Sequence, residues 1–475
     1  MTKGQFRAGV GRATITPPLT VPHAGWGAQT HVYAEGIETD LWATVLLLDD
    51  GTERAAIVDL DLVVINQQET EAIAAAVAGV VGIRPAQVRV SVTHNHTGPP
   101  PSRWDWLDGT DALRRYYESL PEFSAGAARI ALAGLRPARV GVGTGESRVA
   151  VNRRETAPDG RTVAGVNLAG VIDPQVFVLR IDTTEREPLA VLVGYTMHPT
   201  TAGPTFRRIT ADWPGHMKRT VERLTGATCL FAQGATGNIG PGVDSYTDDA
   251  SAIRRLGTLV GYEAARVHLD MRVPAVQPVH ERVWESGAPL GKWTTRPIAV
   301  PEPIVRSRVA TLRLPLRPQP PVPEAAAHLV AVQRKLRELV DRGAPAAEIE
   351  AATFVTKRAN MTVTRARTYG GRSEDAVELH LLRIGPAVLA AISCEPFAEI
   401  ALAIKARSPF PHTWFGGYVG GWGGYIPIAD EYPRGGYEVE TSPFTPEAAA
   451  RVVDGTLAAL QEFHKATEGS EATKR

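Results

Sequence analysis

The stretch VRVSVTHNHTGPP, residues 88–100, decides the fold class and also raises the question of function. Its β-branched residues recur at alternate positions as far as Thr93, a pattern that predicts a β-strand. Gly-Pro-Pro then ends the strand, because proline cannot donate a hydrogen bond to a neighbouring strand. The segment QQETEAIAAAVAGVVG, residues 67–82, predicts a helix, and ERAAIVDLDLVV, residues 53–64, predicts another strand. This β-α-β order predicts an α/β fold with parallel strand pairs.

We expect mixed β-sheets with flanking helices in one large domain, residues 1–465, because no polar linker is long enough to divide the chain. A chain of 475 residues, 44% of them hydrophobic, is large enough to build such a core. Within the domain, residues 272–323 are rich in proline and predict an extended insert. Residues 324–362 predict a helical hairpin, and residues 466–475 predict a disordered tail.

Charge and composition exclude several classes of function. Lysine plus arginine and aspartate plus glutamate number 51 each, so the net charge is zero and no nucleic-acid partner is expected. The longest apolar runs are shorter than the ~20 residues that span a membrane, so we expect no stable membrane insertion. The N-terminal sequence lacks the apolar stretch of a signal peptide, which predicts a cytoplasmic protein. Two cysteines, Cys229 and Cys394, cannot supply a disulfide framework or a cysteine-rich zinc site.

Polar side chains follow several predicted strands at the point where each strand ends. They are His94, His96, His198, Asn238 and Glu395. In open α/β sheets the ligand crevice lies at the carboxyl ends of the strands, and histidine and carboxylate are ligands that zinc takes from proteins. The His94–His96 pair alone is equally well explained by hydrogen bonds to a nearby loop, and for His198 or Glu395 alone a structural role is favoured. Their shared position after apolar strands favours a metal site.

Several segments, in order along nearly the whole chain, resemble the neutral (non-lysosomal) ceramidase family. The segments are GVGRATITPP (9–18), THNHTGPP (93–100), VNRRE (151–155), TMHPTT (196–201), ITADWPG (209–215), FAQGATGNIGP (231–241), ISCEPF (392–397) and GGWGGYIPIADEYPRGGYEVETSPF (420–444). Any one of these matches is weak, whereas the ordered set is specific. The resemblance implies a ceramidase-like catalytic domain, in a divergent member that we expect to lack the family's C-terminal domain.

The resemblance also implies the residues of the site. One Zn²⁺ per chain would be held by His94, His198, Glu395 and Tyr425. His96 and Arg153 would contact the substrate or the negative charge that develops on its carbonyl oxygen, which is where an arginine stabilises a transition state. The position of Tyr425 as a ligand comes from the resemblance alone, because spacing gives no reason to choose it.

The glycine-rich loop departs from the family pattern. Asn238 stands where the family has an acid, and Gly240 stands where it has a serine, which suggests a changed substrate. We therefore predict a zinc-dependent hydrolase in which a metal-activated water cleaves the amide (N-acyl) bond of a soluble small molecule. His96 would carry the proton, and Asn238 is counted with His96 and Arg153 among the catalytic residues.

Two alternatives stay open. The same metal could serve a lactone or ester hydrolase, or a lyase or isomerase, and the altered loop could instead mark a binding protein that has lost catalysis. The expected partner is a small-molecule substrate, and the sequence is compatible with a homo-oligomer. Asp59, Asp61 and Asp212 are expected to support the ligating histidines, with the N-cap of a helix as an equal alternative for Asp212.

Overall fold

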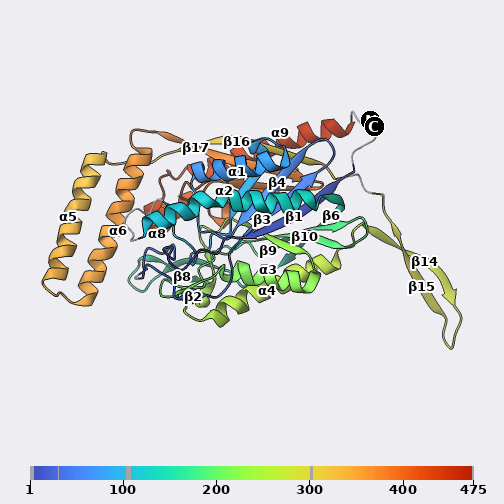
Figure 1. Ribbon diagram of the computed structural model, residues 1–475, viewed down its shortest axis with the longest axis horizontal. Coiled ribbons are helices and arrows are strands. Elements are labelled where there is room, and N and C mark those ends of the chain that lie inside the picture. Colours follow the sequence, from blue (N-terminus) through green and yellow to red (C-terminus); the bar gives the residue numbers. More distant parts are fainter. Residues whose placement is uncertain (1–4, 30, 103–108, 300–302, 473–475) are drawn as a thin grey trace.

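The computed structural model describes residues 5–29, 31–102, 109–299 and 303–472, and it shows a layered α/β architecture (Figure 1). Its main sheet has eight strands in the order β12-β10-β9-β6-β1-β3-β4-β5. Their bounds are β1 (Arg7–Thr14), β3 (Trp42–Asp49), β4 (Arg54–Leu60), β5 (Val88–Val92), β6 (Arg136–Glu146), β9 (Gln175–Thr183), β10 (Pro188–Tyr195) and β12 (Thr228–Gln233). The pairs β4–β5 and β10–β12 are parallel and the others are antiparallel, so the predicted mixed α/β fold is confirmed.

The main sheet consists of two halves, and the edge strands of the sheet, β5 and β12, approach each other. The halves are joined at β1 and β6 by the residue pairs Arg7↔Pro137 and Ala8↔Arg136. At the end of β12, the Gln233 amide donates to the carbonyl of Thr93, which directly follows β5, at 3.0 Å. The carboxyl ends of β5, β10 and β12 therefore lie together, although β5 and β12 are opposite edges of the sheet.

A second sheet of four strands packs on the inner face of the main sheet. It has the order β16 (Val305–Pro315), β17 (Glu374–Ile384), β18 (Ala387–Ile392) and β20 (His412–Gly416). In β3, Leu46 and Leu48 belong to the core between the two sheets, whereas Val45 and Leu47 face the helices outside. Both faces of the strand are buried, which explains its continuous apolar sequence.

Helices cover the outer faces of both sheets (Figure 1). Their bounds are α1 (Gln67–Val81), α2 (Thr110–Ala133), α3 (Asp212–Thr225), α4 (Ala250–Asp270), α7 (Ala398–Arg407) and α9 (Ala448–Ala472). Helices α1 and α2 cover one half of the main sheet, α3 and α4 the other half, and α7 and α9 the four-stranded sheet. Helix α1 is the helix that the sequence predicts at residues 67–82. Asn66 and Glu69 form a capping box at its start, and Gly82 ends it with a left-handed φ of 69°.

Short strands near the carboxyl ends of the main strands complete the fold. They are β2 (Gly36–Ile37), β7 (Val151–Thr156), β8 (Thr162–Asn167), β11 (Arg208–Ile209), β13 (Ile239–Gly240), β19 (Glu395–Pro396) and β21 (Tyr425–Ile426), with the short helix α8 (Tyr437–Thr441). Strand β7 pairs with β13, and β19 pairs in parallel with β21, directly matching Glu395 with Tyr425. Segments far apart in sequence thus meet at one end of the molecule.

Two projections extend from opposite ends of the molecule (Figure 1). One is the hairpin of α5 (Val322–Asp341) and α6 (Ala346–Tyr369), and the other is the ribbon of β14 (Val276–Trp284) and β15 (Leu290–Pro297). The predicted helical hairpin is therefore present and longer than expected. The segment predicted to be an extended insert, residues 272–323, differs from the prediction in one respect. Its strand β16 is a full member of the four-stranded sheet.

The expected disordered tail is wrong for residues 466–472, which continue helix α9. The reason is visible at Thr467, which is 3% exposed and accepts a hydrogen bond from Arg383 of β17 at 2.6 Å. Residues 473–475 lie outside the described residues. Among the helices that the structure describes, none has the length and apolar character needed to cross a membrane.

Candidate metal centre

His94 and His198 meet at the carboxyl ends of β5 and β10, with their Nε2 atoms 3.0 Å apart. The Nδ1 atom of His94 lies 2.7 Å from the carbonyl of Val63, and that of His198 lies 3.1 Å from the carbonyl of Thr236. A carbonyl oxygen only accepts, so each Nδ1 carries the hydrogen and each Nε2 is left to bind a third group. His94 adopts φ 67°, a left-handed conformation that is strained for a non-glycine residue and turns its ring into the cluster.

Glu395 supplies a carboxylate to the same point. Its Oε2 lies 3.4 Å from His94 Nε2 and 3.8 Å from His198 Nε2, and all three side chains are at most 3% exposed. Burial alone raises the pKa of Glu395, but the adjacent His94 and the Trp422 N–H hold that pKa at about 2. Burial, with the Arg153 charge nearby, keeps the pKa of His198 well below its usual range.

The donor set fits a divalent cation. Two imidazole nitrogens that face each other at 3.0 Å repel unless a proton or a cation lies between them, and a buried carboxylate needs a positive partner. Two histidine nitrogens and one carboxylate oxygen are a common protein ligand set for catalytic zinc, which keeps a further position open. The structure therefore brings together three of the four residues that the sequence analysis assigns to the metal.

The fourth assigned ligand, Tyr425, lies beside Glu395 through the β19–β21 pair. Its hydroxyl accepts a hydrogen bond from Arg153 Nη2 at 3.2 Å. Coordination of a metal by Tyr425 remains a prediction, while its position next to the cluster is a property of the fold.

A bulge in β7 directs the Arg153 side chain toward the candidate metal centre. The register of the β7–β8 pair shifts between Asn152 and Arg154, so Arg153 occupies a bulge. As a result the neighbouring arginines both reach Glu438: Arg153 Nε at 2.8 Å and Arg154 Nη1 at 2.7 Å. A 2% exposed Glu438 thus fixes the guanidinium that the sequence analysis places at the substrate oxygen.

His96 completes a group of three histidines whose ligand atoms lie within 4.8 Å of one another. Its Nδ1 donates to the carbonyl of Gly25 at 3.1 Å, and its ring packs on Trp26 with centroids 4.7 Å apart. Burial, with the neighbouring His94, lowers the pKa of His96 to about 3, so the ring is neutral at pH 7. Its Nε2 is buried and has no hydrogen-bond partner within the described part of the chain, so it is available to a substrate or a water.

Asn238 has a different position from the one expected of a catalytic residue. Its Nδ2 donates to Glu399 at 2.9 Å, and its Oδ1 accepts from the backbone N–H of Ala398 at 2.9 Å. Both side-chain atoms are therefore occupied by the first turn of α7, because a neutral amide can both donate and accept there. The side chain of Asn238 thus positions α7. Its backbone carbonyl accepts a hydrogen bond from the backbone N–H of Arg153 at 2.8 Å.

The expected supporting aspartates do not contact the histidines. Asp59 and Asp61 both bind Lys218 of α3, at 3.0 and 2.7 Å, because a buried carboxylate is stabilised more by a cation than by a neutral ring. Asp212 is not the N-cap, which is Ala211. Its carboxylate accepts from the N–H groups of Ala202 and Trp213. Backbone carbonyls take the supporting role instead.

Sequence reasoning missed the groups that hold Glu395. Trp422 Nε1 donates to Glu395 Oε1 at 2.6 Å, and the Tyr418 hydroxyl donates to Oε2 at 3.3 Å. Tyr418 also bonds Thr236 at 2.6 Å and has a left-handed φ of 65°. The high density of Gly, Trp and Tyr in residues 414–440 indicates a pocket-shaping loop, but it does not identify these hydrogen bonds.

Comparisons with known proteins agree with this geometry. Residues 6–249, more than half of the chain, match the family described as neutral/alkaline non-lysosomal ceramidase, N-terminal. The chain belongs to this family. The neutral ceramidase of Pseudomonas aeruginosa is 25% identical over 251 residues, which are 50% of this chain and 37% of that protein. The match thus spans little more than a third of that relative's length.

The fold is shared as well. The crystal structure of neutral ceramidase from Pseudomonas aeruginosa superposes with a TM-score of 0.67 at 19% identity, covering 96% of this chain and 75% of that one. A ceramidase complexed with C2 gives a TM-score of 0.67 at 18% identity, covering 96% and 76%. These likenesses establish the ceramidase fold over nearly the whole chain.

Proposed function

We propose that this ceramidase-family protein is a zinc-dependent hydrolase that cleaves the amide bond of an N-acyl substrate. The observation that carries the proposal is the convergence of His94 Nε2, His198 Nε2 and Glu395 Oε2 within 3.8 Å of one another. A zinc ion held there by these residues, with Tyr425 as a fourth ligand, would polarise the carbonyl and lower the pKa of a water.

The chain's own residues then divide the remaining work. His96 Nε2, which has no hydrogen-bond partner among the described residues, accepts a proton from the attacking water. Arg153 donates to the carbonyl oxygen as that oxygen gains negative charge. Protonated His96 returns the proton to the amine nitrogen as the C–N bond breaks, which yields a carboxylic acid and a free amine, and the acid then releases its proton to the solvent.

Burial of the centre supports a substrate smaller than a two-chain lipid. His94, His198 and Glu395 are 1–2% exposed, so the reacting carbonyl has to reach a nearly enclosed point. A soluble molecule with a short acyl group meets that requirement with less reorganisation of the surrounding loops than a long-chain lipid does. An ester or lactone carbonyl could be attacked by the same groups, so the bond has to be tested directly.

The first test is the metal content of the purified protein, for which we expect about one zinc per chain. His94→Ala and Glu395→Ala should both lose it, whereas His328→Ala, on the exposed surface of α5, should retain it. A metal-free protein under gentle purification, or unchanged metal in both site variants, would contradict the proposal.

The second test is a substrate panel of short N-acyl amines, ceramide in mixed micelles, and lactones. We expect the short amides to be cleaved with the highest kcat/KM and Arg153→Met to lose most of that activity. Cleavage of lactones alone would replace the amide with the ester alternative. No turnover by a zinc-loaded protein would favour the binding-protein alternative.

A further inference from the structure

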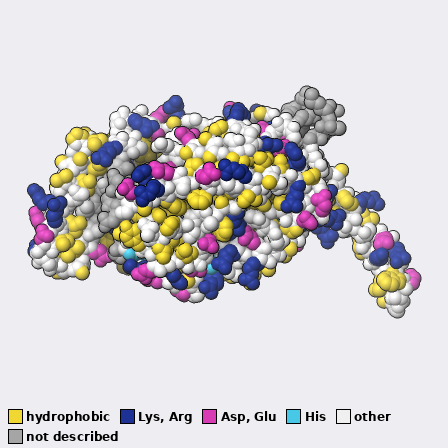
Figure 2. Space-filling model, viewed as in Figure 1, with side chains coloured by type: hydrophobic (Ala, Val, Ile, Leu, Met, Phe, Trp, Pro, Cys, Tyr) yellow, Lys and Arg dark blue, Asp and Glu magenta, His cyan; other side chains and the backbone are white. Residues whose placement is uncertain are grey.

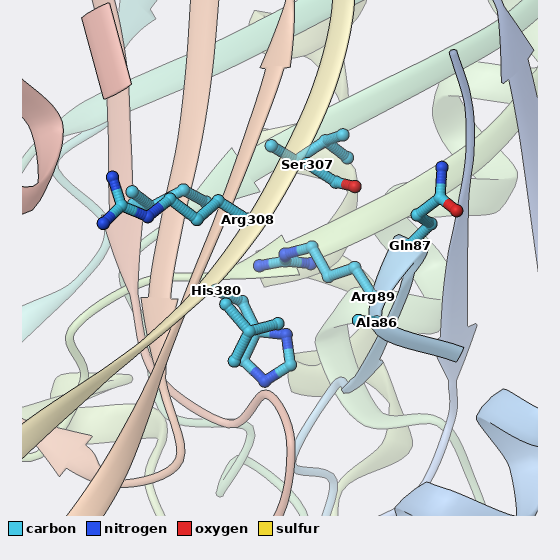
Figure 3. Close-up of a pocket in the computed structure, with 9 residues that line it drawn as sticks. Ala86, Gln87, Arg89, Ser307, Arg308 and His380 are labelled. Carbon is cyan, nitrogen blue, oxygen red and sulfur yellow. The ribbon is translucent and has the colours of Figure 1, made fainter. Parts of the chain in front are cut away.

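A small cavity lies between the two sheets, away from the metal centre (Figure 3). It is bounded by Arg89 of β5, by residues 86–87 in the turn before β5, and by Ser307, Arg308 and His380 of β16 and β17. Arg89 precedes His94 by five residues, a separation of roughly 16 Å along an extended chain. The cavity therefore belongs to the opposite end of β5 from the candidate metal centre.

Arg89 is the unusual feature of this cavity. The residue is 4% exposed, and Figure 3 shows its guanidinium directed into the space between Ser307, Arg308 and His380. Its Nε and Nη1 atoms are buried and have no hydrogen-bond partner within the described part of the chain. Burial lowers the pKa of Arg89 only to about 10, so the side chain stays positively charged at neutral pH.

The neighbouring carboxylates are already bonded to other groups. Glu53 accepts from Ser307 Oγ at 3.0 Å, Glu378 pairs with His380 at 2.9 Å, and Glu462 pairs with Arg308 at 3.0 Å.

Asp59 is the carboxylate whose charge acts on Arg89. Its Oδ2 accepts from Lys218 at 3.0 Å, whereas its buried Oδ1 has no hydrogen-bond partner among the described residues. A buried cation with two unmade hydrogen bonds is costly, so a negative group or a water has to fill the cavity.

We propose that this cavity binds one small monovalent inorganic anion, of which chloride is the common example, through the Arg89 guanidinium. The cavity volume of about 10 Å³ holds a single water-sized or ion-sized body, which excludes a larger organic acid. Arg308, which pairs with Glu462, lies at the rim, and chloride accepts hydrogen bonds from several donors without requiring a fixed geometry. The anion would stabilise the seam where β5 meets β16 and β17.

Crystals of the full chain grown or soaked in sodium bromide test this proposal by anomalous scattering. We expect a bromide peak within hydrogen-bonding distance of Arg89 Nε or Nη1, and no peak in Arg89→Met. A water with no anomalous signal at that position, including one that bridges Arg89 and Asp59, would overturn the proposal.

Thermal unfolding in solution gives an independent test that needs no crystals. At equal ionic strength, bromide should raise the Tm of the unmodified protein by at least about 1 °C relative to gluconate, which is too large for the cavity. Arg89→Met should lose this difference and, in gluconate, should be no less stable than the unmodified protein, because it lacks the unpaired charge. Arg266→Met, on the exposed surface of α4, should keep the difference. An equal bromide effect in Arg89→Met would show that the anion acts elsewhere.

Discussion

Glu395 is held so that one carboxylate oxygen, Oε2, faces the two histidines. The Trp422 N–H at 2.6 Å occupies Oε1, while Oε2 lies 3.4 Å from His94 Nε2. Hydrogen bonds of this kind orient a ligating side chain before a metal binds. Part of the conformational entropy of that side chain is therefore already lost on folding. The affinity of the centre for metal should therefore depend on a residue that does not touch the metal.

Trp422→Phe tests that dependence, because it keeps an aromatic ring and removes the N–H. We expect zinc affinity to fall by about 10- to 100-fold with little change in the fold. The measurement is competition with a chromophoric chelator at pH 7, with circular dichroism as the control for folding. An unchanged affinity would mean that packing alone orients Glu395.

Asp212 is a second residue whose chemistry depends on its environment. Burial raises its pKa to about 6, above the value of about 3.9 expected in the unfolded chain. Between these two values the native state binds a proton that the unfolded state has released. The contribution of Asp212 to stability therefore falls as the pH rises from 4 to 6 and is constant above that range.

The corresponding experiment compares the unmodified protein with Asp212→Asn by urea unfolding at several pH values. Relative to the variant, the unmodified protein should gain on the order of 2–3 kcal/mol between pH 7 and pH 4. The difference between the two proteins cancels the titration of groups that they share. A difference that does not change with pH would contradict the raised pKa.

At the scale of elements, the strand ends were the predictable part of the site. His94 and His198 follow strands of the main sheet, and their approach follows from the rule that ligands gather at the carboxyl ends of strands. Glu395 follows β18 of the other sheet, so its approach depends on packing between sheets, which the sequence pattern does not specify. Family resemblance, rather than periodicity, placed Tyr425 beside it.

The incorrect expectations have the same physical origin. An acid in an apolar strand, such as Asp61, needs a buried partner, and sequence alone does not distinguish a histidine nearby from Lys218, which lies 157 residues away. The sequence likewise does not show that the Asn238 amide bonds to α7. Left-handed residues such as Tyr418 follow from tertiary constraints, because local propensity disfavours them.

The β14–β15 ribbon is the element that depends least on the rest of the molecule. Trp284 is 58% exposed and Trp293 is 63% exposed, and Figure 2 shows apolar side chains at the tip of this projection. The register pair Val276↔Pro297 brings the two ends of the ribbon together, so a short glycine-serine link can replace residues 277–296. We expect the shortened protein to keep its zinc content and a Tm within about 2 °C of the original.

A large loss of stability in the shortened protein would show that the ribbon supports the body of the fold. Light scattering on the same two proteins also tests whether the chain forms the homo-oligomer with which its sequence is compatible. An isolated two-stranded ribbon is marginally stable, and exposed tryptophans are typical of contact surfaces. If copies of the chain associate through the ribbon, the shortened protein will have the mass of a smaller assembly.

At the scale of the whole molecule, the candidate metal centre joins three parts of the fold. His94 follows one half of the main sheet, His198 follows the other half, and Glu395 follows the four-stranded sheet. The two halves of the main sheet share few paired residues at β1 and β6, so a common ligand at their carboxyl ends adds a connection that the backbone does not provide. Metal binding should consequently stabilise the fold as a whole.

Removing the metal should therefore lower the Tm of the entire chain in one transition. A ligand present at 1,000 times its Kd stabilises the native state by about 4 kcal/mol, because it binds the folded protein and not the unfolded chain. We expect a strong chelator to lower the Tm by several degrees, and added zinc to restore it. His94→Ala should start at the lower Tm and show no response to chelator or zinc, whereas His328→Ala should respond as the unmodified protein does. If His94→Ala keeps the full chelator response, the stabilising metal is bound somewhere other than at these three strand ends.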